Sequence, residues 1–375
     1  MSGQTSYVQA GRKRGWLNFE FNLKPGESLL LAIYNRKQSG ETSASNKNDD
    51  KETIEEEIKL KPESITRMDP NVLVLDYCDL ILPGRTDRDL YFYEAQKRAF
   101  NFHGFERNPW DSAVLFQDSL LARNHFPPDS GYRAKFYFSI RPGVDLSSLQ
   151  LAVERPAIFK VEANGQLLKP EERSWWLDKS IAVYPLSQAA RIGVNTVTLI
   201  VKPFDLLAEL EPIYVLGDFA LEEASRGFIL SPAKKLESGS WKKQGLPLYG
   251  HRVKYQTFFK LPESQPPADF YLRLPDWRGS LAEVVVNGEK AGFIISQYDC
   301  LSFGSRLKTG LNEISVIIYG TLKNTLGPHH LNPPPGQAWP GAFQRAPEGG
   351  QPAGSEYNNQ DYGLVGEIVI GRLKK

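Results

Sequence analysis

The sequence predicts an all-β protein made of two consecutive β-sandwich units of the jelly-roll type. Short apolar runs are separated by turn residues, with almost no helical periodicity between them. The composition is rich in aromatic residues, Gly and Pro (Phe 20, Tyr 16, Trp 7, Gly 31, Pro 26), which suits a turn-rich β protein. One strand-turn-strand pattern also occurs twice. At 375 residues the chain is too long for one ordinary core and suits two.

The N-terminal part, residues 1–35, contains two strand-like runs around a turn. WLNFEF at 16–21 alternates, LKPGES makes the turn, and LLLAIY at 29–34 has the composition of a buried strand. Because an isolated hairpin is marginally stable, we expect a remnant of an upstream sandwich. Residues 36–64 are polar and include Glu55-Glu56-Glu57. We interpret them as a polar linker or an edge hairpin.

The first sandwich unit is expected at 65–223. Its strands are VLVLDYCDL at 72–80, YRAKFYFSI at 132–140, LQLAVERP at 149–156, IFKVEANG at 158–165, VNTVTLIVKPF at 194–204 and YVLGDFAL at 214–221. Part of DLYFYEAQKRAF at 89–100 is the one helical pattern. Strands this short, without helices between them, favour a sandwich over a parallel sheet.

The second unit, expected at 224–375, repeats the order of the first. Asn164-Gly165 and Asn287-Gly288 each end a strand and begin the next, as in a type I′ hairpin. Each turn is preceded by an alternating strand, YRAKFYFSI in the first copy and VKYQTFFKL at 253–261 in the second. Each turn is followed by a strand that starts with G-x-N, and each copy closes with a similar strand, YVLGDFAL in the first and YGLVGEIVI at 362–370 in the second. We therefore expect the two units to share one topology.

Several motifs resemble the sugar-binding sandwich domains that accompany glycoside hydrolases. Four segments are similar to the galactose-binding-like domains of bacterial α-L-rhamnosidase-like and glycoside hydrolase family 2 enzymes: W-x-x-Q-G-x-P-x-Y at 241–249, VVVNGEKAG, the G-x-N strand start and LKNTLGPHH at 322–330. The adjoining domain of the same enzymes is resembled by four further segments, ERP, VEANG, WWLDK and NPWD. The resemblance covers about 65–375. It implies a catalytic (β/α)8 barrel outside this chain and a periplasmic or extracellular location, although the chain shows no signal peptide.

Composition excludes some functions. Lys+Arg 45 against Asp+Glu 44 leaves a formal charge of +1, which does not support nucleic-acid binding. No run approaches the roughly 20 apolar residues of a membrane span. Cys78 and Cys300 are far apart, so a disulfide framework is not indicated. We expect no cofactor, while a structural cation such as calcium stays open.

The sequence identifies no catalytic residue. Glycoside hydrolysis needs two carboxylates across a sugar ring, roughly 5–10 Å apart. Asp76 and Asp79, three apart on a strand, point to opposite faces. Glu209 and Glu211 could share a face, but we interpret them as surface acids.

Sugars bind to aromatic faces flanked by polar side chains. The candidate carbohydrate-binding residues are Trp110, Asp111, Trp175, Trp176, Asp178, Trp241, Tyr249, Trp277, Arg278, His329 and His330. Trp175 and Trp176 are adjacent on a strand and must face opposite ways, and Trp277 lies in the turn PDWRG, which favours exposure. No third His, Cys or carboxylate lies at metal-ligand spacing from His329 and His330. The two histidines are therefore expected either to anchor the loop or to contribute polar groups to a sugar site.

The favoured function is a non-catalytic carbohydrate-binding or barrel-supporting region of a glycoside hydrolase. Its partners would be an oligo- or polysaccharide and the catalytic barrel of the same enzyme. A second hypothesis is retained hydrolase activity at the junction of the units, with acids such as Asp111, Asp178 or Asp218. A third is a structural interaction module that binds no glycan, which a sandwich fold alone does not distinguish.

Overall fold

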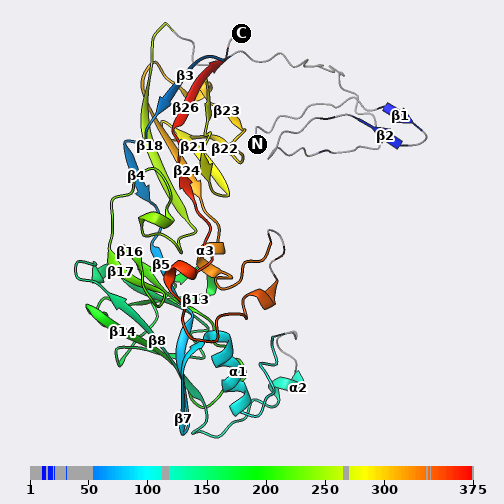
Figure 1. Ribbon diagram of the computed structural model, residues 1–375, viewed down its shortest axis with the longest axis vertical. Coiled ribbons are helices and arrows are strands. Elements are labelled where there is room, and N and C mark those ends of the chain that lie inside the picture. The colour runs from blue at the N-terminus through cyan, green and yellow to red at the C-terminus, as the bar shows by residue number, and fades with distance from the viewer. Residues whose placement is uncertain are drawn as a thin grey trace.

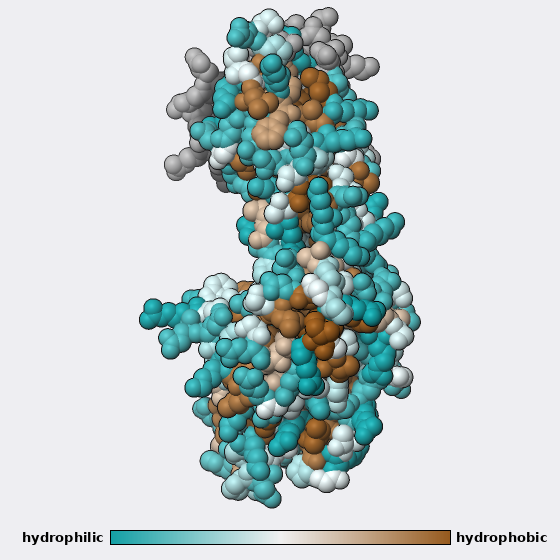
Figure 2. All heavy atoms as spheres, turned by 90° about the vertical axis from the view of Figure 1, so that its left-hand side faces the viewer, coloured by the Kyte–Doolittle hydropathy of each residue, from teal (hydrophilic) through white to brown (hydrophobic). Residues whose placement is uncertain are grey.

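The computed structural model of the chain (Figure 1) is all-β, which confirms the predicted fold class. It describes residues 11–13, 16–19, 21, 31, 54–111, 118–264, 270–334, 337 and 339–373. Two sandwich units are stacked end to end, and Figure 2 shows them as rounded bodies joined at a narrower waist. The three α-helices of the described residues are short: α1 (Phe92–Phe102), α2 (Asp118–Leu121) and α3 (Lys323–Leu326).

Unit one packs two sheets. The first has the order β11 (Gln166–Leu167), β10 (Lys160–Ala163), β14 (Gly193–Val201), β8 (Tyr132–Ile140), β17 (Phe228–Pro232) and β16 (Phe219–Glu223), with β6 (Tyr77–Leu82) and β7 (Arg85–Tyr91) joined through β8. The second runs β12 (Trp175–Trp176), β13 (Asp178–Pro185), β9 (Gln150–Glu154), β15 (Ile213–Gly217) and β5 (Asn71–Leu75). Alternate residues of β8 are buried, as its sequence pattern predicts.

Unit two has the same plan. Its first sheet runs β22 (Glu289–Ile294), β21 (Leu281–Val286), β24 (Gly310–Tyr319), β18 (Arg252–Leu261) and β4 (Ser64–Arg67). The second runs β23 (Cys300–Ser302), β19 (Phe270–Arg273), β26 (Ile368–Leu373) and β3 (Ile54–Leu60), and β20 (Trp277–Arg278) pairs with β25 (Gly363–Leu364). The orders β11-β10-β14-β8 and β22-β21-β24-β18 are equivalent, which confirms the predicted repeat.

The start of the described chain differs from the expectation. Residues 54–67, assigned mostly to a polar linker, form β3 and β4, which are edge strands of unit two. Glu57 faces Arg273, with 2.7 Å between Oε2 and Nη2, so a charged edge strand explains the polar composition. Unit two is therefore built from segments on both sides of unit one. Unit one also continues to β17, beyond the expected boundary at 223.

The expected N-terminal remnant is only partly described. β1 (Gly11–Lys13) pairs with β2 (Trp16–Asn18), which contains the start of the predicted run at 16–21. The second predicted strand, at 29–34, lies outside the described residues except for Leu31.

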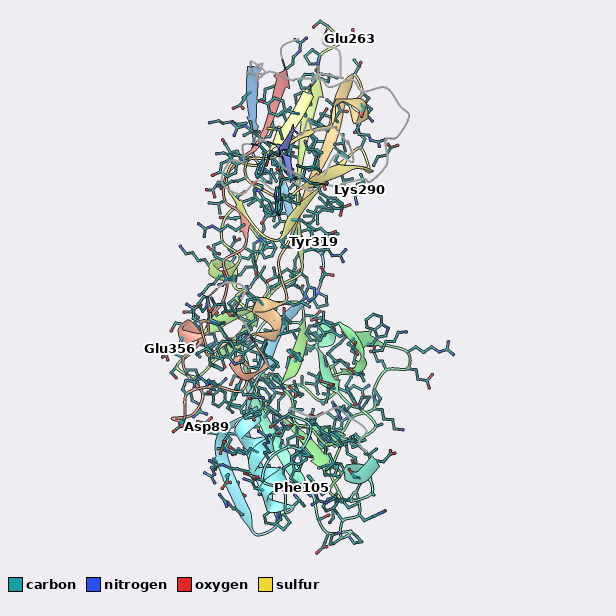
Figure 3. All side chains as sticks on the ribbon, turned by 90° about the vertical axis from the view of Figure 1, so that its right-hand side faces the viewer. Asp89, Phe105, Glu263, Lys290, Tyr319 and Glu356 are labelled. Carbon is teal, nitrogen blue, oxygen red and sulfur yellow. The ribbon has the colours of Figure 1, made fainter. Side chains whose placement is uncertain are left out.

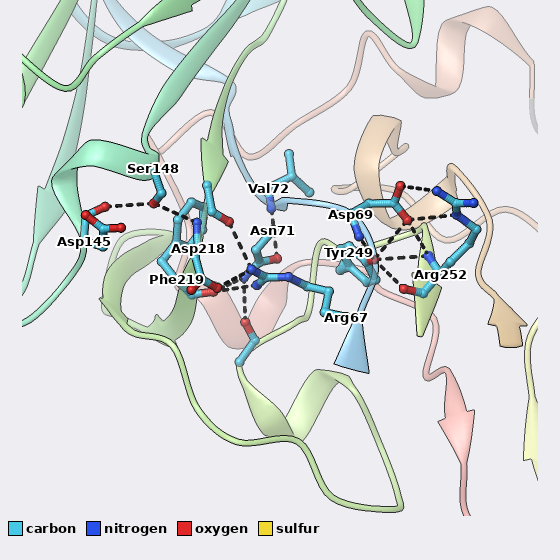
Figure 4. Close-up of polar contacts among 12 residues, drawn as sticks. Arg67, Asp69, Asn71, Val72, Asp145, Ser148, Asp218, Phe219, Tyr249 and Arg252 are labelled. Carbon is cyan, nitrogen blue, oxygen red and sulfur yellow. Dashed lines mark hydrogen bonds and ion pairs between the residues drawn. The ribbon is translucent and has the colours of Figure 1, made fainter. Parts of the chain in front are cut away.

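The segment between β4 and β5 ties the two units together (Figure 4). Arg67 donates to the Phe219 carbonyl at 3.1 Å and pairs with Asp218 at 2.5 Å. Asp69 forms a two-point ion pair with Arg252, at 2.8 and 3.1 Å. These contacts fix the junction with charge-assisted bonds on both of its sides.

A second connection is the loop 327–362, which leaves unit two after α3 and crosses to unit one. Tyr91 donates its hydroxyl hydrogen to the Phe343 carbonyl at 2.8 Å, and Gly227 donates its N–H to Pro352 at the same distance. Figure 3 shows Glu356, near the end of this loop, at the level of unit one. Together with the β4–β5 segment, this loop makes two separate ties between the units.

The duplicated Asn-Gly turns have the predicted geometry. φ is 51° and 83° at Asn164 and Gly165, and 53° and 83° at Asn287 and Gly288. In both hairpins the two residues connect directly paired strand ends, so positive φ at both positions fits the type I′ turn.

We expect Gly288→Val to lower the free energy of unfolding of unit two by about 1–3 kcal/mol, because a β-branched residue is strained at positive φ. No atom lies within 4 Å of the added Cβ, so backbone strain is the sole local cost. Chemical denaturation measures the loss, and Gly288→Asn is the control that retains most of the stability. Equal stability of the Val and wild-type proteins would contradict the turn assignment.

Candidate carbohydrate-binding site

Three aromatic candidates belong to the cores. Trp110, Trp241 and Tyr249 are 6%, 1% and 0% exposed. The Trp110 indole donates to the Leu206 carbonyl, and the Trp241 indole donates to the Tyr255 hydroxyl, both at 2.6 Å. Burial leaves no ring face for stacking on a sugar, so these residues are removed from the candidates.

The two adjacent histidines are also enclosed. His330 Nε2 lies 2.7 Å from Asp76 Oδ2, with both side chains 1% exposed, and Tyr357 donates to the other oxygen of Asp76 at 2.9 Å. His329 is buried, which lowers its pKa to about 4 and keeps the ring neutral at pH 7. Neither ring reaches a glycan. Their position fits the alternative interpretation, in which they anchor the loop 327–362 to unit one.

Trp175 and Trp176 point to opposite faces of the edge strand β12. Trp175 is 53% exposed, whereas Trp176 is partly buried and packs on Tyr214 with ring centroids 4.7 Å apart. Asp178 accepts from the Ser180 N–H and hydroxyl, and Asp111 accepts from the Tyr93 hydroxyl at 2.9 Å. Trp175 therefore remains a stacking candidate on unit one.

Trp277 and Arg278 line a pocket in unit two of about 370 Å³, named here the Trp277 pocket. Its lining residues are Trp277, Arg278, Gly279, Ile295, Ser296, Gln297 and Tyr298. The expected exposure of Trp277 is wrong: only 9% of it is exposed, because most of its indole packs into the core of unit two. Arg278 is exposed, and its guanidinium pairs with Asp361 at 2.8 Å.

The opposite wall of the pocket is the loop after β22. Asp299 Oδ2 accepts from the N–H groups of Ile295 and Ser296 at 2.8 and 3.0 Å, which folds the loop into a compact turn. Tyr298, at its tip, is 45% exposed. Gly279 allows the end of β24 to approach closely, because a Cβ at position 279 would lie 2.6 Å from the Tyr319 carbonyl oxygen.

The Trp277 pocket combines an exposed phenol ring with a guanidinium, an amide and hydroxyl groups. This chemistry suits a sugar, whose C–H face stacks on an aromatic ring while its hydroxyls pair with polar groups. Sequence reasoning identified Trp277 and Arg278 but missed Gln297 and Tyr298. The signal for them was the polar-aromatic loop SQYD immediately after an apolar strand.

A second group of polar residues lies at the ends of β9 and β15 in unit one. This Glu211 site consists of Glu154, Arg155, Glu209, Glu211 and Tyr214. Burial raises the pKa of Glu211 to about 8, and the charges of Glu154 and Glu209 reinforce the shift. Glu209 pairs with Arg155 and accepts from Asn108 at 2.9 Å. Both Glu209 and Glu211 are partly buried, so the expectation of surface acids is wrong.

Within the described residues, no group of three or more His, Cys, Asp or Glu side chains is placed to hold a metal ion. None of the helices described is long and apolar enough to cross a membrane.

The fold and these sites define an all-β protein with an aromatic and polar surface pocket in unit two. No family model matches the chain, and no curated protein matches it. Among solved structures, the rhamnosidase from Novosphingobium sp. PP1Y is 16% identical and covers 64% of this chain at a TM-score of 0.26. The β-glucuronidases of Bifidobacterium dentium and Ruminococcus gnavus are 17% and 11% identical over 41% and 70% of this chain, both at 0.26.

The chain spans 23%, 28% and 45% of the length of these three structures. TM-scores this low do not establish a common fold.

Proposed function

We propose that this chain is a non-catalytic, carbohydrate-binding region of a bacterial glycoside hydrolase whose catalytic barrel lies outside the chain. The glycan is held in the Trp277 pocket by stacking on Tyr298 and by polar contacts with Arg278 and Gln297. The observation that carries the proposal is this pocket, whose lining residues include the exposed Tyr298 together with Arg278 and Gln297. The motif resemblance to sugar-binding sandwich domains supports it.

The architecture supports an additional role as a spacer that buttresses the barrel. The units are joined by the β4–β5 segment with its two ion pairs and by the loop 327–362. Two separate ties resist bending at the waist better than a single linker does. A rigid two-unit body would hold the Trp277 pocket at a fixed distance from an attached domain.

The test is a glycan array, followed by calorimetry with the best ligand. We expect Tyr298→Ala to weaken binding about tenfold, because an aromatic stacking contact contributes about 1 kcal/mol beyond its buried area. Tyr298 is exposed at a loop tip, so the variant should melt as the wild type does.

Trp175→Ala is the matched control, since it removes a similarly exposed aromatic residue from unit one. It should leave affinity unchanged. Loss of binding in Trp175→Ala but not in Tyr298→Ala would move the site to unit one. A folded protein that binds no glycan on the array would favour the structural interaction module instead.

Glycoside hydrolysis by the chain itself is the second candidate function, favoured by the raised pKa of Glu211 beside Glu154. A protonated carboxylic acid near a second carboxylate is the pattern of a general acid and its partner. However, Glu154 ends β9 and Glu211 precedes the neighbouring β15, so the two acids come from adjacent strands and not from opposite walls of a cleft. We expect no turnover of aryl rhamnosides, galactosides or glucuronides; turnover that Glu211→Gln abolishes would overturn this.

A further inference from the structure

Unit one contains a surface cavity of about 370 Å³, named here the Asp89 pocket, which shares no lining residue with the Trp277 pocket. Residues of β5, β6 and β8 line it, together with Ser225 and Arg226 in the turn between β16 and β17. The loop 327–362, which comes from unit two, contributes Gln351. The pocket is therefore completed by the loop that ties the two units together.

A β-bulge sets the position of Asp89, which Figure 3 shows on unit one. β7 has one residue more than β6 where Asp79 and Asp89 lie, so the strand pair is locally irregular. Asp89 has φ 55°, a left-handed conformation that few residues other than Gly adopt. Because a bulge changes the direction of a side chain, the Asp89 carboxylate lines the cavity at the edge of the sheet.

Hydrogen bonds within the protein hold the polar groups of the Asp89 pocket in place. Asp79 accepts from the Tyr137 hydroxyl at 2.8 Å and from the Asp89 N–H at 2.9 Å. The Asp89 carboxylate pairs with the Arg226 guanidinium and accepts from the Gln351 N–H at 3.4 Å. Side chains that are already ordered lose little freedom when a ligand binds, so this arrangement is preorganised.

The same groups keep hydrogen-bonding capacity for a ligand. The Arg226 side chain is 58% exposed, and a single nitrogen of its guanidinium, which has five N–H donors, contacts Asp89. Gln351 donates from its amide nitrogen to the Tyr357 hydroxyl at 3.1 Å, which leaves its amide oxygen as an acceptor. Ser225 adds a hydroxyl group from an exposed position. The pocket thus offers both donors and acceptors.

An exposed aromatic ring and the charge of the pocket define the class of ligand. The Tyr137 side chain is 43% exposed, so a ring face is open for the C–H surface of a sugar. Two carboxylates, Asp79 and Asp89, lie beside one guanidinium, that of Arg226, which disfavours an anionic ligand. A cation is also disfavoured, because Asp89 is paired and both Asp79 oxygens accept hydrogen bonds.

We propose that the Asp89 pocket is a second carbohydrate site, which takes a neutral pyranose with its C–H face on Tyr137 and its hydroxyl groups on Arg226 and Gln351. This goes beyond the proposed function, because the site lies in the other unit and does not depend on the Trp277 pocket. A polysaccharide that reaches both pockets would bind more tightly than a ligand confined to one of them.

The experiment is a titration of the full chain carrying Tyr298→Ala, followed by saturation-transfer NMR at pH 7. The probes are methyl β-glucopyranoside and methyl β-galactopyranoside, each compared with the uronate that has a carboxylate at C6. We expect at least one neutral glycoside to bind, and to bind at least tenfold more tightly than its uronate, because a like charge in the pocket is repelled.

Tyr137→Ala in the same background should weaken binding of the neutral glycoside about tenfold, since it removes the ring. Trp175→Ala is the matched control, because it removes an exposed aromatic residue of unit one outside the pocket. Arg226→Met is the second variant if Tyr137→Ala does not fold, and it should also weaken binding.

Three results would each overturn the proposal: no binding of either neutral glycoside, a uronate that binds as tightly as its neutral counterpart, or unchanged affinity in folded Tyr137→Ala. Tyr137→Ala alone, with Tyr298 intact, should keep the glycan affinity of the Trp277 pocket. Failure at one site is therefore distinguishable from failure at the other.

Discussion

Asn312→Leu is expected to lower the free energy of unfolding of unit two by about 3–5 kcal/mol, the range for breaking a buried polar network. Asn312 is fully buried. Its Nδ2 donates to the carbonyls of Lys308 and Gly310 at 2.8 and 3.0 Å, and its Oδ1 accepts from the Lys308 N–H at 2.9 Å and from Asn287 Nδ2 at 2.8 Å. Leucine has the same branching at Cγ but would remove all four of these hydrogen bonds.

The first unit offers an internal control, because Asn195 repeats this network. Its Nδ2 donates to Arg191 and Gly193, and its Oδ1 accepts from the Arg191 N–H and from Asn164 Nδ2 at 2.8 Å. Asn195→Leu should destabilise unit one by a comparable amount. Amide exchange assigns each loss to its unit. A cost under about 1 kcal/mol in both variants would mean that the network contributes little.

Glu211→Gln is expected to stabilise the protein at pH 8 and to flatten its dependence on pH. The folded pKa of Glu211, about 8, lies above the ordinary value of 4.5, so the folded state holds the proton more tightly than the unfolded state. This contribution is fully present below about pH 4.5 and is lost as the pH rises toward 8. The variant should gain more than about 1 kcal/mol relative to wild type over that window.

Denaturation curves between pH 4 and pH 9 measure this effect. Glu289→Gln, which changes an exposed acid in unit two, is the control and should keep the wild-type pH profile. A Glu211→Gln protein whose stability falls with pH as steeply as that of the wild type would show that another group controls this range.

The local patterns predicted much of the fold. Alternation placed β8 at the expected residues, and the helical pattern at 89–100 overlaps α1. The paired Asn-Gly turns predicted both hairpins and the repeat, because positive φ is a requirement that the sequence itself displays. These features depend on neighbours in the chain.

The remaining features depend on contacts between distant segments. The acidic sequence of β3 predicts a polar linker, because the partner that balances its charge, Arg273, is more than 200 residues away in the chain. The G-x-N asparagines could be recognised as recurrent, but their bonds to Asn164 and Asn287 appear only when the strands are paired. Likewise, the burial of Trp277 and the raised pKa of Glu211 follow from packing, which periodicity does not reveal.

The central claim is that unit two holds a glycan in the Trp277 pocket. A crystal structure of the protein with the best glycan from the array tests it most directly. We expect sugar density stacked on Tyr298, with hydroxyl groups within hydrogen-bond distance of Arg278 and Gln297. Density confined to Trp175 or to the Glu211 site, with the Trp277 pocket empty at saturating ligand, would contradict the claim.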